Sequence, residues 1–126
     1  MQVTTDMEYL ADCDCLLICQ RGELSPETIK SARQQSRPFY TQHAIHKALV
    51  DYRQADLTRL RLIELDTLAQ EFRNDLPDCH TMAIVFTASA DITSYQHIKN
   101  VCEIHRVTTE IFDDFDAARR WIARQA

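Results

Sequence analysis

The sequence predicts an α/β domain with a mixed sheet of four or five strands and about four helices, in the order β-β-α-β-α-β-α-β-α. Strand-like and helix-like hydrophobic patterns alternate along all 126 residues. The last such pair, at residues 106–123, runs from a β-branched segment through two aspartates into an amphipathic helix pattern. This alternation is typical of sheets whose strands are joined by packed helices.

Length and composition indicate one globular domain that covers residues 1–126. Hydrophobic residues make up 45% of the chain and charged residues 26%, which is the usual globular range and argues against disorder. A domain of about 150 residues buries roughly 68–70% of the surface of its unfolded chain. The chain is therefore long enough for one ordinary core.

Charge and hydropathy argue against several classes of partner. The chain has 14 Lys and Arg against 19 Asp and Glu, and its basic residues are scattered, so the electrostatic pattern of nucleic-acid or anionic-lipid binding is missing. The purely apolar runs, such as residues 16–19, are far shorter than the ~18 residues of a membrane span, and the first residues lack signal-peptide features. We therefore expect a cytoplasmic protein with no nucleic-acid partner and no membrane insertion.

The first elements read as a hairpin followed by a helix. Residues 3–10 are moderately strand-like, residues 11–14 suit a turn, and residues 15–21 form a stronger strand that Gly22 is expected to end. The second strand is apolar on both parities, so it is expected inside the sheet with both faces covered, which makes helices on both sides plausible.

A helix is predicted to begin after Ser25. Ser25 can cap this helix, Pro26 suits its first position, and Leu24 can pack on Ile29 across the first turn. Proline lacks an amide hydrogen and clashes with the preceding helical turn, so Pro38 is expected to end the helix.

The middle of the chain is predicted to add a strand, a helix and a second strand. Residues 45–53 contain a two-sided apolar segment at 48–50. Residues 57–76 carry apolar side chains at helical spacing, and this helix is expected to end before Pro77. Residues 79–88 are β-branched or aromatic at their centre and apolar on both parities, which is typical of a central strand.

The last three elements are a helix, a strand and a helix. Asp91 can cap the first of them, whose apolar stripe begins at Tyr95. Residues 107–112 form the last strand, and Asp113 or Asp114 then caps the last helix. The side chains that this helix is expected to bury are Phe115, Ala118, Trp121 and Ile122.

Four segments taken together resemble the SpoIIAA-like branch of the STAS-like fold. They are residues 22–27 (GELSPE), 49–53 (LVDYR), 82–86 (MAIVF) and 111–122 (IFDDFDAARRWI). Their joint order spans nearly the whole chain. The resemblance implies a mixed, four- or five-stranded sheet packed with helices, in a family whose bacterial members are largely uncharacterised.

The resemblance does not extend to a phosphorylation switch. Phospho-regulated relatives carry an Asp-x-Ser loop after the third strand, with an acceptor serine at the start of the next helix. The corresponding residues 51–63 hold no serine and no glycine. Asp51 is the one residue that matches, and Thr58 carries the only serine-like hydroxyl. Asp51 is alternatively a strand-end residue that hydrogen-bonds loop amides.

The cysteines and the densest acidic cluster are explained without a metal or cofactor. The five cysteines lie mostly in apolar segments, so we expect free thiols that pack as small hydrophobes. Cys13 and Cys15 would project from one strand face about 6.6–7 Å apart. A zinc site needs four ligands, and Cys79 and His80 would point to opposite faces. The three aspartates Asp113, Asp114 and Asp116 suit a helix N-terminus better than a cation site.

Aromatic residues give the one positive indication of a binding site. Tyr40 and Tyr52 are expected in or near loops, and Tyr95 lies on a predicted helix. A shallow apolar pocket where helices meet the sheet would fit them, and small-molecule sites are usually of this kind. Ordinary core packing is the alternative.

Three functional hypotheses follow, and we prefer the first. A non-enzymatic, regulatory STAS-like module would bind a protein partner or form a homodimer, because the fold resemblance comes without a catalytic constellation. A carrier or sensor would hold a small apolar or lipid-like ligand with Tyr40, Tyr52 and Tyr95. An enzyme would require an unusually reactive thiol among the five cysteines.

Overall fold

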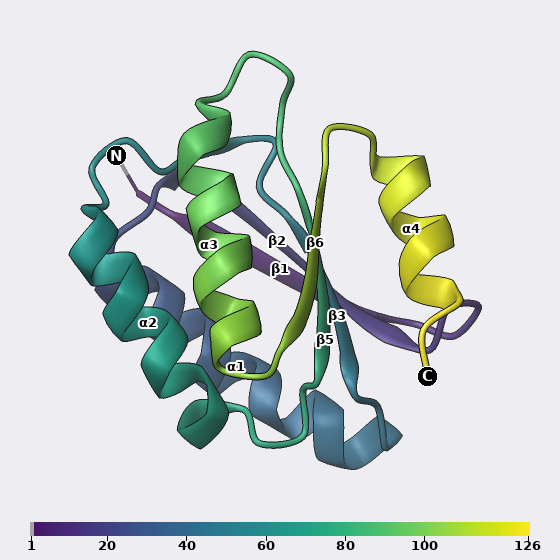
Figure 1. The fold of residues 1–126 in the computed structure, drawn as a ribbon. Helices are drawn as coiled ribbons and strands as arrows, with labels where there is room; N and C mark the ends of the chain where they lie inside the picture. The colour runs from purple at the N-terminus through teal and green to yellow at the C-terminus, as the bar shows by residue number, and fades with distance from the viewer. Residues whose placement is uncertain (1) are drawn as a thin grey trace.

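The computed structural model describes residues 2–126 as a six-stranded sheet with four helices (Figure 1). The strands are β1 (Thr4–Leu10), β2 (Cys15–Glu23), β3 (Lys47–Asp51), β4 (Ala55–Asp56), β5 (Thr81–Val85) and β6 (Thr108–Phe112). The helices are α1 (Pro26–His43), α2 (Leu62–Asp75), α3 (Ile92–Ile104) and α4 (Phe115–Ala123). The predicted order of elements is confirmed, with β4 as an additional short strand.

The sheet is mixed, as the sequence predicts. Its strand order is β1-β2-β3-β5-β6, with β1 antiparallel to β2 and each later neighbour parallel. β4 pairs with the end of β2, where Gly22 is opposite Ala55. β5 lies between β3 and β6, so the prediction of an interior strand at residues 79–88 is confirmed.

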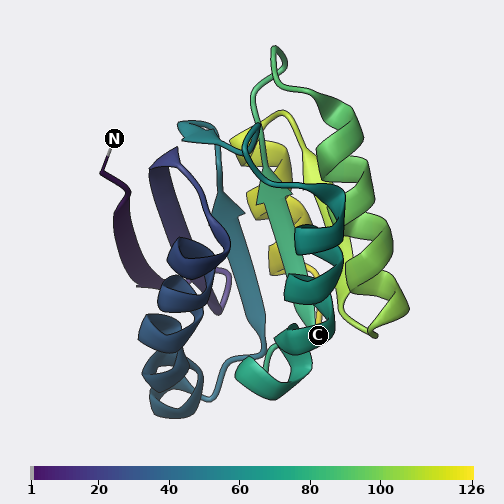
Figure 2. The ribbon, with the colours of Figure 1, turned by 90° about the vertical axis from the view of Figure 1, so that its left-hand side faces the viewer.

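The helices divide unequally between the two faces of the sheet. The connections through α1, α2 and α3 each step in the same direction across the strand order. Parallel crossovers are right-handed, so connections that step the same way place their helices on the same face. The last helix, α4, covers the other face; it stands apart from the other three in Figure 1 and lies behind the strands in Figure 2.

Two apolar cores result, one on each face of the sheet. The core under α1, α2 and α3 contains Ile18, Val50 and Ile84. The core under α4 contains Leu49 of β3 and Ile122 of α4. The alternation of Leu49 and Val50 between the cores confirms that β3 is apolar on both faces because both are covered.

The predicted start of α1 is confirmed in detail. Ser25 has extended backbone angles, and its Oγ accepts a hydrogen bond from the Thr28 amide at 3.2 Å. Thr28 Oγ1 accepts in return from the Ser25 amide at 2.9 Å, and Pro26 is the first helical residue. These bonds satisfy two amides that would otherwise lack partners.

The predicted end of α1 at Pro38 is wrong, because the helix continues to His43. Pro38 and Gln34, whose carbonyl loses its helical donor, both lie on the exposed side of the helix, where water can hydrate the freed carbonyl. Two residues further, the Tyr40 side chain is buried in the core and holds the continuation in place. The helix ends instead at His43, and the next residue, Ala44, has a left-handed backbone and donates its amide to the Tyr40 carbonyl.

Two other predicted boundaries also move. β2 continues through Gly22 to Glu23, because the Gly22 amide donates to the Gln54 carbonyl at 3.1 Å beside β4. Gly22 has a φ of 105°, and a Cβ there would lie 3.0 Å from the Gln2 carbonyl oxygen. The second helix begins at Leu62 instead of residue 57, because pairing with β2 keeps the chain extended through Asp56.

Candidate functional site

An apolar pocket lies between the sheet and the three helices α1, α2 and α3. It has an empty volume of about 780 Å³, part of which is open solvent. β2, β3 and β5 contribute its floor through residues such as Ile18 and Val50, and Phe72 of α2 lies opposite. The pocket is at the boundary between helices and sheet, where the sequence predicted an apolar pocket.

Small side chains on three different elements help to leave this space open. Ala32 of α1, Ala48 of β3 and Ala69 of α2 all line the pocket. An alanine fills less of the space between a helix and a sheet than the leucines and isoleucines around it, so three alanines that face one region leave room there.

Tyr40 supplies a hydroxyl without a hydrogen-bond partner in the pocket lining. Its side chain is 4% exposed, and its phenolic oxygen is the one buried side-chain N or O atom among residues 2–126 that makes no hydrogen bond. Burial raises the Tyr40 pKa well above its usual value, with further effects from nearby Cys79 and Ser36. Neither neighbour makes a hydrogen bond of acceptable geometry with the phenol, so its hydroxyl is a neutral donor and acceptor without a partner.

Three other polar side chains in the lining already have partners. Ser36 Oγ donates to the Arg33 carbonyl at 2.7 Å, and Gln20 Nε2 donates to the Thr28 carbonyl at 3.3 Å. The Arg33 guanidinium lies 5.0 Å from the centre of the Phe72 ring and pairs with Asp75 at 3.2 Å. The Tyr40 hydroxyl is therefore the fully buried polar atom of the lining that lacks a partner.

Two of the three predicted ligand residues line the pocket, and the third does not. Tyr40 and Tyr52 both line the pocket, although Tyr40 lies within α1 and not in a loop. Burial raises the pKa of Tyr52 to about 12. Tyr95 lies outside the lining and stacks on Phe86, with 4.9 Å between the ring centres.

The pocket lining also contains three residues that were not predicted from the sequence, Gln20, Arg33 and Ser36. Gln20 shares the parity of Ile18 on β2, which indicates the same face of the sheet. Arg33 and Ser36 lie one turn apart on the face of α1 that Tyr40 continues. The expected end of the helix at Pro38 separated Tyr40 from this face and concealed the pattern.

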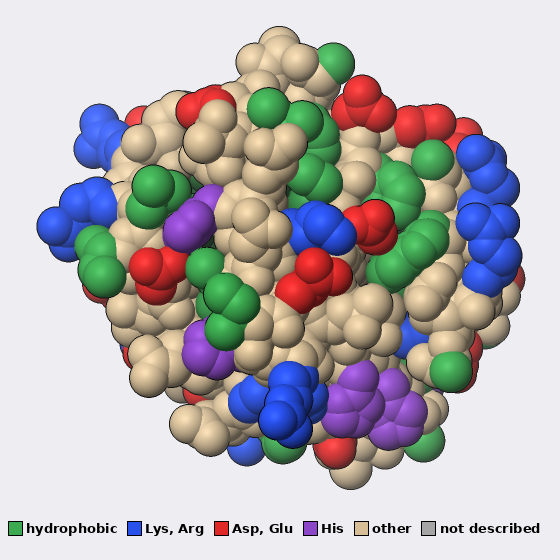
Figure 3. Space-filling view, viewed as in Figure 1, with side chains coloured by type: hydrophobic (Ala, Val, Ile, Leu, Met, Phe, Trp, Pro, Cys, Tyr) green, Lys and Arg blue, Asp and Glu red, His purple; other side chains and the backbone are tan. Residues whose placement is uncertain are grey.

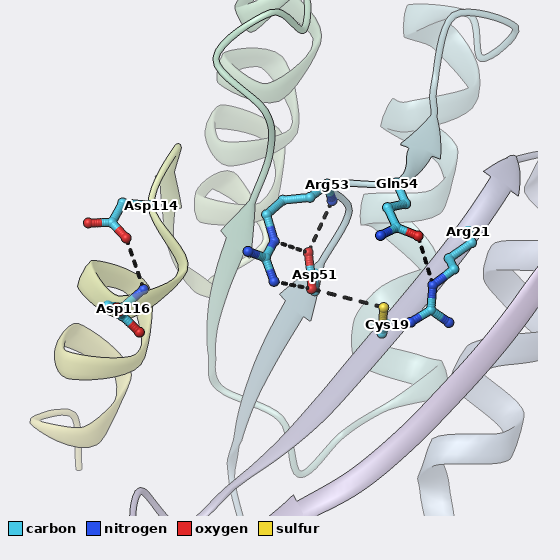
Figure 4. A network of polar contacts seen from close by, with 7 residues as sticks. All are labelled: Cys19, Arg21, Asp51, Arg53, Gln54, Asp114 and Asp116. Atoms are coloured by element: carbon cyan, nitrogen blue, oxygen red, sulfur yellow. Dashed lines mark hydrogen bonds and ion pairs between the residues drawn. The ribbon is translucent and has the colours of Figure 1, made fainter.

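The family-matching residues Asp51 and Thr58 make different sets of contacts. Asp51 ends β3 and accepts hydrogen bonds from the Arg53 amide and guanidinium at 2.8–3.1 Å (Figure 4). Thr58 instead donates to Asp56 Oδ1 at 2.6 Å, in the turn before α2. Because α2 begins only at Leu62, Thr58 does not occupy the first turn of a helix.

Arg53 extends the Asp51 group toward α4. Its guanidinium carbon lies 4.8 Å from the centre of the Phe115 ring. Burial acts to raise the Asp51 pKa, but hydrogen bonds and positive charge from Arg53 outweigh it, so the pKa is below its usual value. Cys19 Sγ lies 4.0 Å from Asp51 Oδ2, and a dashed line marks this contact in Figure 4.

The metal-ligating residue types do not gather into a site. Within residues 2–126, no group of three or more His, Cys, Asp or Glu side chains is arranged to hold a metal ion. Asp114 caps α4 by accepting from the Asp116 amide at 3.1 Å.

Figure 3 shows acidic and basic side chains interspersed with apolar ones over the face that carries α2 and α3. Across the described range, no helix combines the length and apolar character needed to cross a bilayer.

Comparison with known proteins supports the fold. No family model matches the chain, and no curated protein matches it. Among solved structures, it is similar to an uncharacterised DUF3478-family protein with a SpoIIAA-like fold from Shewanella loihica PV-4. The two share 18% sequence identity with a TM-score of 0.54, over 95% of this chain and 93% of the other. The chain therefore has the SpoIIAA-like fold that its sequence resemblance implied.

Proposed function

We propose that the chain is a non-enzymatic cytoplasmic protein that binds a small, mostly apolar molecule in the pocket under α1, α2 and α3. The observation that carries this proposal is the unpartnered Tyr40 hydroxyl in the lining of an apolar cavity. A buried hydroxyl without a hydrogen bond costs about 1–3 kcal/mol by mutational measures. A guest that offers one hydrogen-bonding group would remove this cost and displace water from apolar walls.

The non-enzymatic part of the proposal is supported by the state of the thiols. Burial is the main cause that raises the pKa of all five cysteines, Cys13, Cys15, Cys19, Cys79 and Cys102. A cysteine that catalyses a fast reaction at neutral pH needs the opposite shift, because the thiolate is the reactive form. A binding role uses the pocket and needs no activated group.

Substitution of Tyr40 by Phe is expected to separate ligand binding from stability. Loss of the unsatisfied hydroxyl should raise the free energy of unfolding of the ligand-free protein by about 1 kcal/mol. Loss of one hydrogen bond to the guest should weaken binding about tenfold. Native mass spectrometry of the protein as purified, beside a denaturing spectrum of the same sample, measures the non-covalent adduct and its mass.

Two further variants serve as controls for the pocket. Tyr95→Phe removes a phenol outside the lining and should leave the adduct unchanged. Ala69→Leu places three more carbons into the pocket and should remove the adduct. A fluorescence titration with anilinonaphthalene sulfonate tests the same site with a known apolar probe. Equal probe binding by the wild type and Ala69→Leu, with no adduct in repeated preparations, would contradict the proposal.

A protein partner or a homodimer is a second candidate, favoured by exposed apolar side chains at the start of α2. Leu62 is 50% exposed and its neighbour Ile63 is 62% exposed. Contiguous exposed apolar side chains mark protein contact surfaces more often than isolated ones do. They mark one place where a second chain could pack.

Substitution of Ile63 by Glu tests this second candidate. If the surface is a homodimer interface, a buried carboxylate would shift the sedimentation equilibrium from dimer to monomer. Ile104→Glu, at the far end of α3 and 72% exposed, is the matched control and should leave the mass unchanged. A wild-type protein that is monomeric and captures no partner through this surface would argue against the candidate.

A further inference from the structure

Cys13 and Cys15 form a close pair of thiols outside the pocket. Their Sγ atoms are 3.3 Å apart in the turn between β1 and β2, whereas a regular strand would separate such side chains by about 6.6–7 Å. The intervening Asp14 has a φ of 51°, and this left-handed backbone curls the chain at the point where the thiols meet. Both cysteines belong to the core under α4.

Contacts on both sides of the turn fix its shape and keep the two thiols close together. The Tyr9 hydroxyl donates to Asp14 Oδ1 at 2.8 Å, and the Tyr9 ring stacks on His43 with 4.0 Å between ring centres. On the other side, Arg119 of α4 donates to Asp12 Oδ2 at 2.5 Å. Asp12 Oδ1 in turn accepts from Cys13 Sγ at 3.5 Å.

Cys13 is the outer thiol of the pair. Its exposed fraction is 3%, but it lies between Asp12 and Asp14, which are both exposed, whereas Cys15 is fully buried at the start of β2. A reagent that enters the turn therefore meets Cys13 first. Burial raises the pKa of both thiols, so reaction at neutral pH is slow and must be followed to equilibrium.

We propose that Cys13 and Cys15 are a reversible redox dithiol that exchanges with low-molecular-weight disulfides. The Cys13 thiolate attacks one sulfur of the small disulfide, forms a mixed disulfide and releases one small thiol. Cys15 then attacks the Cys13 sulfur, closes the intramolecular bond and releases the second small thiol. The two cysteines lose two protons and two electrons, and the small disulfide is reduced to two thiols, so atoms and electrons balance.

The loop that a disulfide between Cys13 and Cys15 would close is very short, which favours a reversible switch over a structural crosslink. A disulfide stabilises a fold mainly by restricting its unfolded chain, and this effect grows with the length of the closed loop. A bond from Cys13 to Cys15 encloses only Asp14, so it adds little stability and is readily reduced. Oxidation also removes the hydrogen bond that the Cys13 thiol donates to Asp12. Asp12 is the residue through which the turn contacts Arg119 of α4.

Graded glutathione buffers test the proposal on the full chain. The reduced protein is incubated without oxygen at increasing ratios of oxidised to reduced glutathione until its spectrum stops changing. It is then denatured, alkylated with N-ethylmaleimide and weighed by mass spectrometry. The expected result is a change from five alkylated cysteines to three, with no retained glutathione. Fragmentation of the wild-type peptide should place the bond between Cys13 and Cys15.

Single cysteine substitutions identify independently which two thiols form the disulfide. Cys13→Ser and Cys15→Ser should each abolish the loss of two alkylation sites, and Cys19→Ser should keep it. Five alkylated cysteines at every glutathione ratio would overturn the proposal, as would a bond mapped to any other pair. These thiols lie on the face opposite the ligand pocket, so the result is independent of the Tyr40→Phe experiment.

Discussion

Replacement of Ile122 by Ala is expected to lower the free energy of unfolding by about 2–5 kcal/mol. Ile122 is fully buried, and it anchors the one helix that covers the second face of the sheet. Its loss would leave a cavity above Leu49 and Val85, which no other helix is placed to fill. The expected cost is therefore at the upper end for a single apolar side chain.

Urea denaturation followed by tryptophan fluorescence measures this change directly. Trp121, the only tryptophan, lies next to Ile122 on α4, so the signal reports the helix under test. Ile104→Ala is the matched control, because Ile104 is also on a helix but is 72% exposed, and its change should stay within about 0.5 kcal/mol. Equal effects of the two substitutions would show that α4 is not anchored as described.

Substitution of Asp51 by Asn is expected to cost about 1–3 kcal/mol at pH 7, because the carboxylate accepts charge-assisted hydrogen bonds from Arg53. The Asp51 side chain is mostly buried and the Arg53 side chain is half-exposed, so water screens the pair only in part. An amide keeps the shape of the side chain but removes its charge and one acceptor. The difference in urea midpoint between the wild type and the variant measures the cost.

The same pair predicts a pH dependence with a definite sign. The folded-state pKa of Asp51 lies below its usual value, so the unfolded chain takes up its proton first as the pH falls. The contribution of Asp51 is complete well above the unfolded pKa of about 3.9 and is lost as the pH falls through the folded pKa. The stability difference between the wild type and Asp51→Asn should therefore shrink as the pH is lowered from about 5 toward 3.

Asp6→Asn provides the control for both measurements. Asp6 pairs with Arg21 at 2.7 Å, but its side chain is largely exposed, and such surface pairs contribute about 0–1 kcal/mol. A loss at Asp51 no larger than the loss at Asp6, or a difference that does not change with pH, would contradict the role assigned to Asp51.

The order of elements could be predicted because it depends on local patterns. The hydroxyl of Ser25 and the carboxylates of Asp91 and Asp114 cap the three helices where the sequence places them. β4 could not be predicted, because two residues carry no periodicity and the strand forms only against the end of β2. The continuation of α1 past Pro38 depends likewise on a distant event, the burial of Tyr40 against the core.

The candidate sites were less accessible to prediction than the fold. The pocket depends on Ala32, Ala48 and Ala69, which lie far apart in the sequence and meet only after packing. The contact between Cys13 and Cys15 depends on the left-handed backbone of Asp14, and nothing in the local pattern requires it. Aromatic content correctly suggested an apolar pocket, but Tyr95 shows that composition cannot decide which ring lines it.

The single helix over the second face has a consequence for biosynthesis. Because α4 follows all six strands in the chain, the apolar side chains of β3 and β5 on that face stay uncovered on the ribosome until residues 115–123 emerge. Nascent chains with exposed sheet surface are prone to aggregation and are usual clients of chaperones. A premature stop before Phe115 would leave all strands of the sheet in place but expose the apolar face that α4 normally covers. Such truncated products should therefore aggregate and accumulate in inclusion bodies.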